Sequence, residues 1–193
     1  MSFNLLELEP TKVSRDLRDK YLLLYGLPKS GKTSLATQIP DSLLVSFERG
    51  YNGLAGIYAV DIPKWSSFKE LMRELKKPEV QQKFQTVIID TATIAWEKCE
   101  EFVCIQNDVK ELGEIPWGKG YKLCAKEFNQ TFREISMLGY GIVFLAHSEE
   151  KNLSEESSET FVCPSLEKRA YKIINGMVDI IGYIDVDFNS GKR

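Results

Sequence analysis

Residues 21–34 read YLLLYGLPKSGKTS, and this stretch decides the fold. The apolar residues 21–25 predict a buried strand, the pattern G-x-x-x-x-G-K-T follows at residues 26–33, and residues 34–38 predict a helix. A strand, a loop with two glycines and a helix in this order are the context of a phosphate-binding loop. Glycine lets backbone amides approach an anion closely, and the helix N-terminus attracts negative charge. The sequence therefore predicts a site for a nucleoside triphosphate.

The loop is expected to hold ATP and Mg²⁺. Lys32 would reach the β- and γ-phosphates, and the hydroxyl of Thr33 would ligate Mg²⁺. The backbone amides of residues 29–33 would point at the polyphosphate. A glycine-rich turn without a chemical role is the alternative. The predicted nucleotide-binding residues are Gly26, Leu27, Pro28, Lys29, Ser30, Gly31, Lys32, Thr33 and Ser34.

The length and composition suit one α/β domain. The 193 residues are 43% hydrophobic, enough for a sizeable core. No run approaches the roughly 18 apolar residues of a membrane span, and the first residues do not form a signal peptide. We therefore expect a soluble, cytoplasmic protein that does not bind membranes.

The net charge of −3 argues against a generally basic surface, so any DNA contact must be local. The four cysteines fit no zinc spacing, and we interpret them as reduced thiols.

Strand and helix patterns alternate along the chain. This predicts an α/β fold with a mostly parallel sheet and helices on both faces. Pro78 is expected to close a helix. Residues 107–120 and the glutamate-rich residues 148–160 are expected to be loops, the second of them mobile. The further expected strands are residues 42–47, 58–62, 84–90, 142–147, 161–164 and 178–187, and the further expected helices are residues 66–76, 91–105, 121–138 and 165–175.

The expected domain organisation is simple. Residues 1–20 form an arm or a short helix, and residues 21–193 form the ATPase core. Residues 187–193 look like a strand that enters a hairpin turn without a return strand. We therefore expect the natural chain to continue beyond Arg193.

Three predicted strands end in a polar residue beside the phosphate-binding loop, because the carboxyl ends of parallel strands share one edge of the sheet. Glu48 would polarise a water molecule for attack, as a general base. Asp90 follows four apolar residues, as in a Walker B motif, and would hold Mg²⁺ through water opposite Thr33. His147 would sense the γ-phosphate and signal to the next loop. The alternatives are solvated acids and a histidine bonded to the backbone; Arg49 is expected to form a surface ion pair.

Together these residues resemble a RecA-like P-loop NTPase core, in particular the phage-encoded ATP-binding proteins of single-strand annealing and recombination. The shared text is the G-x-x-x-x-G-K-T loop, then E-x-G at residues 48–50, D-T at residues 90–91, H-S-E at residues 147–149 and M-V-D at residues 177–179. The resemblance implies an ATPase that binds single-stranded DNA and forms homo-oligomers with ATP between subunits. The cation that reaches the neighbouring subunit's ATP would be Lys168 or Arg169, and the alternative is a solvated helix face.

The resemblance also implies that two loops face DNA. Trp117, Lys119, Tyr121 and Lys122 interleave aromatic and basic groups, as stacking on single strands with phosphate pairing needs. The alternative is a tryptophan that anchors the core. The second loop departs from the pattern, because five glutamates in residues 148–160 face only one lysine. Either that loop does not contact DNA, or binding is weak or assisted by a partner such as a single-stranded-DNA-binding protein.

Three functions are compatible with these features. The leading hypothesis is a DNA-stimulated ATPase of phage-type recombination or annealing. The second is a nucleotide-switched protein that binds a partner and hydrolyses ATP weakly. The third is a small-molecule kinase, which the absence of arginine from residues 148–160 disfavours, since kinase lids are rich in arginine.

Overall fold

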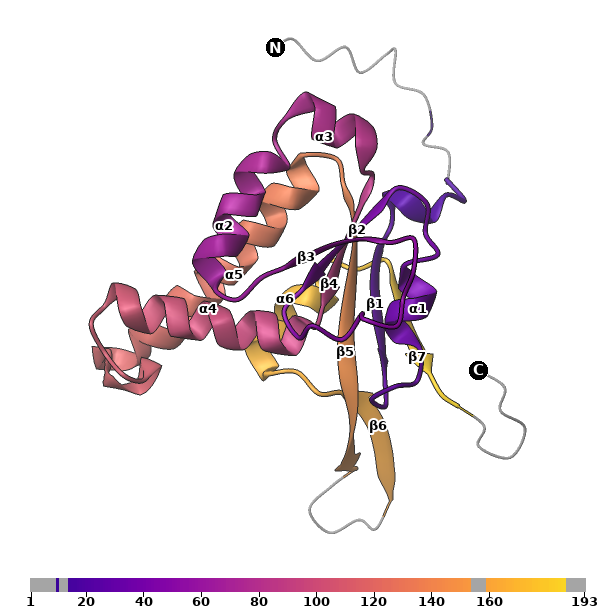
Figure 1. Ribbon diagram of the computed structural model, residues 1–193. Helices are drawn as coiled ribbons and strands as arrows, with labels where there is room; N and C mark the ends of the chain where they lie inside the picture. Colours follow the sequence, from indigo (N-terminus) through magenta and orange to yellow (C-terminus); the bar gives the residue numbers. More distant parts are fainter. Residues whose placement is uncertain (1–9, 11–13, 154–158, 187–193) are drawn as a thin grey trace.

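The computed structural model describes Pro10, residues 14–153 and residues 159–186. Its strands form one seven-stranded sheet in the order β3-β2-β4-β5-β1-β7, with β6 paired to β5 outside this path (Figure 1). All pairs are parallel except β5–β6. This confirms the predicted α/β fold with a mostly parallel sheet. The strands are β1 (Tyr21–Gly26), β2 (Ser42–Ser46), β3 (Tyr58–Asp61), β4 (Thr86–Asp90), β5 (Gly141–Asn152), β6 (Thr160–Pro164) and β7 (Ile180–Ile184).

Helices cover both faces of the sheet, as predicted, but unequally (Figure 1). In the described part of the chain most of them lie on one face, and α1 covers the other together with Tyr51 and Ile57 of the loop before β3. Burial on both faces explains why the central strands are continuous apolar runs rather than alternating ones. The helices are α1 (Lys32–Ala36), α2 (Trp65–Glu74), α3 (Pro78–Lys83), α4 (Ala92–Gln106), α5 (Lys119–Met137) and α6 (Lys168–Asn175), with 3-10 turns η2 (Leu17–Asp19), η3 (Leu112–Glu114) and η4 (Pro116–Gly118).

An aromatic cluster fills the core between the sheet and the larger helical layer. Trp65 of α2 stacks on Phe128 of α5 with 5.7 Å between ring centroids, and Phe132 meets Phe144 of β5 edge-on at 4.9 Å. All four side chains are fully buried. Aromatic burial of this extent makes α2, α5 and β5 one rigid scaffold for the edge of the sheet. No helix in the described part of the chain is both long and apolar enough to span a membrane.

Two predicted elements were wrong. Pro78 does not simply close a helix; it begins α3, because proline suits the first helical position, where no amide is needed. Residues 148–152 are not a loop, because β5 continues through them and pairs antiparallel with β6. His147 therefore lies in the middle of β5 rather than at its end. The resulting hairpin protrudes from the sheet (Figure 1).

Some predictions fall on residues outside the described part of the chain. Residues 154–158 of the glutamate-rich segment, expected to be a mobile loop, are among these, and so is the predicted terminal turn at residues 187–193. Of the four cysteines, Cys99, Cys104 and Cys124 are buried free thiols, whereas Cys163 on β6 is half-buried.

Candidate nucleotide-binding site

The register of the sheet brings the predicted site residues together at one edge. Gly26 at the end of β1 lies opposite His147 of β5, and Asp90 at the end of β4 lies opposite Ser46 at the end of β2. Glu48 follows Ser46 by two residues. The strand ends therefore converge, as predicted, because the register of the sheet places these residues opposite one another.

The phosphate-binding loop turns tightly between β1 and α1. Gly31 has a φ of 94°, which favours glycine, and it forms the N-cap of α1. Gly26 allows a close approach, because a Cβ there would lie 2.2 Å from the backbone oxygen of Ile184 on β7. A side chain at either position would deform the loop.

Lys32 is buried inside the loop, with 5% of its surface exposed. Its ammonium donates to the carbonyl oxygens of Gly26, at 2.9 Å, and Leu27, at 2.7 Å. Burial lowers the pKa of Lys32, and the nearby carboxylates of Asp90 and Glu48 oppose this effect. The cation thus lies where it can exchange carbonyl oxygens for the oxygens of a polyphosphate.

Unlike Lys32, another polar group of the loop has no partner among the described residues. The Ser30 hydroxyl is buried, and its oxygen forms no hydrogen bond there. A buried, unsatisfied hydroxyl is costly unless a ligand or water satisfies it. Its place in the loop fits a bound polyphosphate.

Thr33 and Asp90 meet as a Walker A and Walker B pair should. The Thr33 hydroxyl donates to Asp90 Oδ2 at 2.9 Å. Burial raises the pKa of Asp90, and the hydrogen bond from Thr33 opposes this. A hydroxyl and a carboxylate in contact are hard oxygen ligands that suit Mg²⁺.

Glu48 is held from two neighbouring strands. Thr91, which follows Asp90 across a cis peptide bond, donates its hydroxyl to Glu48 Oε1 at 2.7 Å. His147 Nε2 lies 3.4 Å from the same oxygen, and His147 Nδ1 is buried without a partner among the described residues. No hydrogen bond between described residues reaches Oε2. Thr91 was not predicted as a site residue; only its place after the Walker B acid marked it.

One cavity of about 500 Å³ is lined by Lys32, Thr33, Glu48, Asp90, Thr91 and His147 together. Phosphate-loop residues form one wall, and the loop after β2, with Gly50, Gly53 and Leu54, forms another. Arg49 does not line this cavity; its guanidinium pairs with Asp61 at 3.5 Å, the surface ion pair that was predicted.

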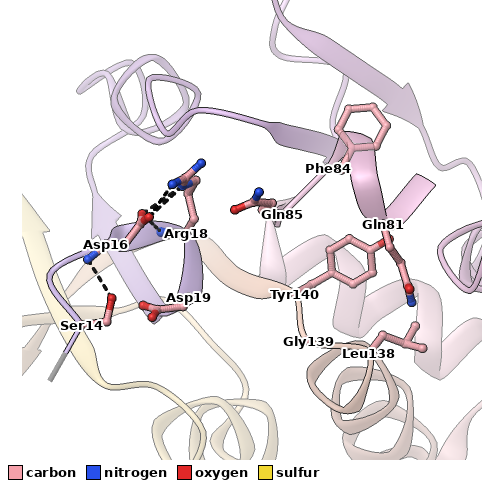
Figure 2. Close-up of a pocket in the computed structure, with 10 residues that line it drawn as sticks. All are labelled: Ser14, Asp16, Arg18, Asp19, Gln81, Phe84, Gln85, Leu138, Gly139 and Tyr140. Atoms are coloured by element: carbon pink, nitrogen blue, oxygen red, sulfur yellow. Dashed lines mark hydrogen bonds and ion pairs between the residues drawn. The ribbon is translucent and has the colours of Figure 1, made fainter. Parts of the chain in front are cut away.

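A second cavity, of about 410 Å³, lies beside η2, the end of α3 and the turn before β5. Figure 2 shows Arg18 and Asp16 paired on one wall, across from Gln81 and Tyr140. Arg18 binds Asp16 at 2.6 Å and Asp41 at 3.2 Å, so its charge is already neutralised. This cavity offers no free charge to a phosphate, and we do not assign it a ligand.

The predicted DNA-contacting residues differ in exposure and in their partners. Trp117 is 89% exposed, so it does not anchor the core, and Lys119 and Lys122 are exposed beside it. Tyr121 instead packs under Arg169 of α6, whose guanidinium lies 4.6 Å from the ring centroid. These residues lie around the connection from α4 to α5 and do not line the nucleotide cavity.

Lys168 and Arg169, the two candidates for the cation that reaches a neighbouring subunit's ATP, differ in their partners. Arg169 is occupied within its own chain, since it packs over Tyr121 and pairs with Glu167 at 2.8 Å. Lys168 is exposed and has no partner among the described residues.

Comparisons with known proteins identify the family of the chain. A family model described as "AAA domain" matches residues 18–193. The chain is also 26% identical over 189 residues to the SPbeta prophage-derived uncharacterized protein YorG of Bacillus subtilis (strain 168). The match covers 95% of this chain and 56% of YorG, so the chain spans about half the length of this curated relative.

Proposed function

Because the chain belongs to the AAA domain family of P-loop ATPases, we propose that it binds ATP with Mg²⁺, hydrolyses it and couples nucleotide state to single-stranded DNA binding. The observation that supports hydrolysis best is the meeting of Lys32, Thr33, Asp90 and Glu48 around one cavity. We place the activity in phage-type recombination or annealing, and a relative whose name says that it is prophage-derived supports this setting.

Binding would begin at the phosphate loop. Lys32 exchanges its bonds to the carbonyl oxygens of Gly26 and Leu27 for β- and γ-phosphate oxygens, and Ser30 gains a partner for its hydroxyl. Thr33 and Asp90 would hold Mg²⁺, which would supply charge neutralisation at the phosphates. Lys32 and Asp90 are buried, so both act in a low dielectric, where charge contacts are strong.

Glu48 would then act as the general base. Its Oε2 accepts a proton from a water molecule, the water oxygen forms a bond to the γ-phosphorus, and the bond to the β–γ bridging oxygen breaks. The products are ADP and phosphate. Glu48 lines the nucleotide cavity, as this role requires.

His147 would report the nucleotide state. It approaches Glu48 through Nε2, and its backbone carbonyl accepts the Ser165 N–H at 2.8 Å, at the base of the β5–β6 hairpin. A change at Glu48 can therefore reach the hairpin through one residue. This extends the predicted sensor role to a strand rather than to a loop.

The DNA contact in this proposal is the α4–α5 connection. The exposed indole of Trp117 is free to stack on a base, with Lys119 and Lys122 near it for phosphates. Tyr121, under Arg169, contributes through that contact rather than through a base. In an oligomer, Lys168 is the better candidate for the cation that acts on a neighbouring subunit.

A nucleotide-switched partner protein is the second candidate, and the hairpin favours it. Glu150 is exposed on β5, and Glu149 pairs with Lys151 at 2.8 Å, so the two glutamates outnumber the one lysine and give this protruding element an acidic surface that would repel DNA. A basic protein partner would suit it instead. In this case the hairpin would change with nucleotide, and hydrolysis would stay slow with or without DNA.

The test is steady-state ATP hydrolysis at low salt, with and without single-stranded DNA, for the wild type, Lys32→Ala and Glu48→Gln. Stimulation of the wild type by DNA, lost in both variants, supports the leading proposal. Hydrolysis that ignores DNA favours the partner-binding candidate. A surface variant, Lys76→Ala, serves as the control because Lys76 pairs with Glu134 on the helical face and does not line the nucleotide cavity.

A further inference from the structure

Thr91 occupies the N-cap of α4, yet its side chain does not cap the helix. Threonine is common at this position because its oxygen accepts a hydrogen bond from the first turn, which stabilises a helix by about 1 kcal/mol. In this chain α4 has no side-chain cap, and the Thr91 hydroxyl donates to Glu48 instead, at 2.7 Å. Capping of α4 therefore does not explain why this hydroxyl points at Glu48.

The bond from Thr91 to Glu48 joins a buried hydroxyl to a partly exposed carboxylate. Thr91 is 1% exposed, whereas 28% of the Glu48 side chain is exposed. A hydrogen bond donated to a carboxylate is stronger than one between neutral groups. The turn that carries Glu48 is fixed from its other side as well, because the buried Ser46 hydroxyl accepts the Arg49 N–H at 2.9 Å. Both the backbone and the carboxylate of Glu48 are thus held in place.

The two oxygens of Glu48 are not equivalent. Oε1 accepts the Thr91 hydroxyl and is the atom nearest to His147, whereas no hydrogen bond between described residues reaches Oε2. A base needs one oxygen held and one oxygen available for the proton. The arrangement supplies this asymmetry before any substrate binds.

We propose that Thr91 is a positioning residue, which holds Glu48 through Oε1 so that Oε2 takes the proton from the attacking water. The inference rests on the proposed hydrolysis by Glu48. Thr91 adds no charge to the reaction and takes no proton. Its loss leaves Glu48 free to rotate, so the chemical step slows while the phosphate loop still binds ATP.

The test compares kcat and KM for Thr91→Val, which keeps the shape without the hydroxyl, and Thr91→Ser, which keeps the hydroxyl. We expect Thr91→Val to lower kcat roughly 10- to 100-fold, the effect of one hydrogen bond to a charged group, with KM within about twofold. Thr91→Ser should restore most of kcat. In a Glu48→Gln background, Thr91→Val should add no further loss.

A matched control stands two residues further along α4. The Thr93 hydroxyl donates to the Ser165 carbonyl and not to Glu48, so Thr93→Val should keep the basal kcat. Equal losses in Thr91→Ser and Thr91→Val would assign the effect to packing and overturn the inference. A wild-type kcat in Thr91→Val, beside an inactive Glu48→Gln, would overturn this inference alone. Full activity of Glu48→Gln would overturn the proposed function, and the inference with it.

Discussion

Ser165 donates its backbone N–H to the carbonyl oxygen of His147 over 2.8 Å. Its own carbonyl accepts the Thr93 hydroxyl, also at 2.8 Å. The base of the β5–β6 hairpin is thereby bonded to the strand that carries the predicted sensor and to the first turn of the helix after the Walker B acid. His147 lines the nucleotide cavity, whereas Ser165 and Thr93 lie outside it and anchor the hairpin.

Replacing Thr93 tests how the hairpin is anchored. Thr93→Val removes one hydrogen bond and should lower the free energy of unfolding by about 1 kcal/mol, with faster hydrogen exchange of the β6 amides. Thr93→Ser should behave as the wild type in both. Hydrogen exchange followed by mass spectrometry measures the local effect, and unchanged exchange in Thr93→Val would show that this bond does not hold the hairpin.

Gly26→Ala tests the close approach of β7 to the phosphate loop. The new Cβ would lie 2.2 Å from the Ile184 backbone oxygen, so a strand must shift. We expect a loss of about 2 kcal/mol, roughly 5 °C in the unfolding temperature, together with weaker ATP binding. Gly113→Ala is the control, because its Cβ would meet its nearest neighbour at 3.9 Å. Equal unfolding temperatures for the two variants would contradict the packing described.

Glu100 on α4 predicts a dependence of stability on pH. Burial raises the pKa of Glu100 above its ordinary 4.5, although the indole of Trp96 donates to this carboxylate at 2.8 Å. The folded protein therefore holds this proton more tightly than the unfolded chain does, so the contribution of Glu100 to stability falls as pH rises from 4.5 through the raised pKa.

Glu100→Gln removes this charge and keeps an acceptor for the indole. The variant should unfold at a higher temperature than the wild type at neutral pH, and the difference should vanish below pH 4.5. Glu70→Gln, an exposed change on α2, is the control, because Glu70 is not among the charges that shift the pKa of Glu100. Thermal unfolding from pH 4 to pH 8 measures both, and a Glu100→Gln variant that is less stable at neutral pH would refute the burial argument.

Trp117→Ala tests the proposed DNA contact. Because the indole is 89% exposed, the unfolding temperature should not change. Affinity for single-stranded DNA should fall about 5- to 100-fold, the value of one stacked base. Met137→Ala is the matched control, since Met137 is 87% exposed at the other end of α5. Equal DNA affinity of the two variants, measured by fluorescence anisotropy, would remove Trp117 from the interface.

The sequence predicted the parts of the site that follow from sheet geometry. Once residues 21–34 were identified as strand, loop and helix, the ends of parallel strands had to share one edge. Glu48, Asp90 and His147 were found from this rule and their order, and the structure places all three around one cavity.

Contacts that depend on side-chain direction could not be predicted. A threonine after Asp90 looks like a helix cap, and only the structure shows its hydroxyl on Glu48. The partnership of Tyr121 with Arg169 joins residues 48 positions apart, and no local pattern signals it. The glutamates of residues 148–152 indicated a loop, but cross-strand backbone pairing with β6 outweighs their low strand propensity.

The most direct measurement is a single-turnover ATP hydrolysis assay of the wild type and Glu48→Gln, with ATP affinity determined for both. The account predicts that Glu48→Gln binds ATP as tightly as the wild type, because Lys32 and the phosphate loop are intact, and hydrolyses it at least about 100-fold more slowly. Hydrolysis by Glu48→Gln at the wild-type rate would contradict the assignment of Glu48 as the base.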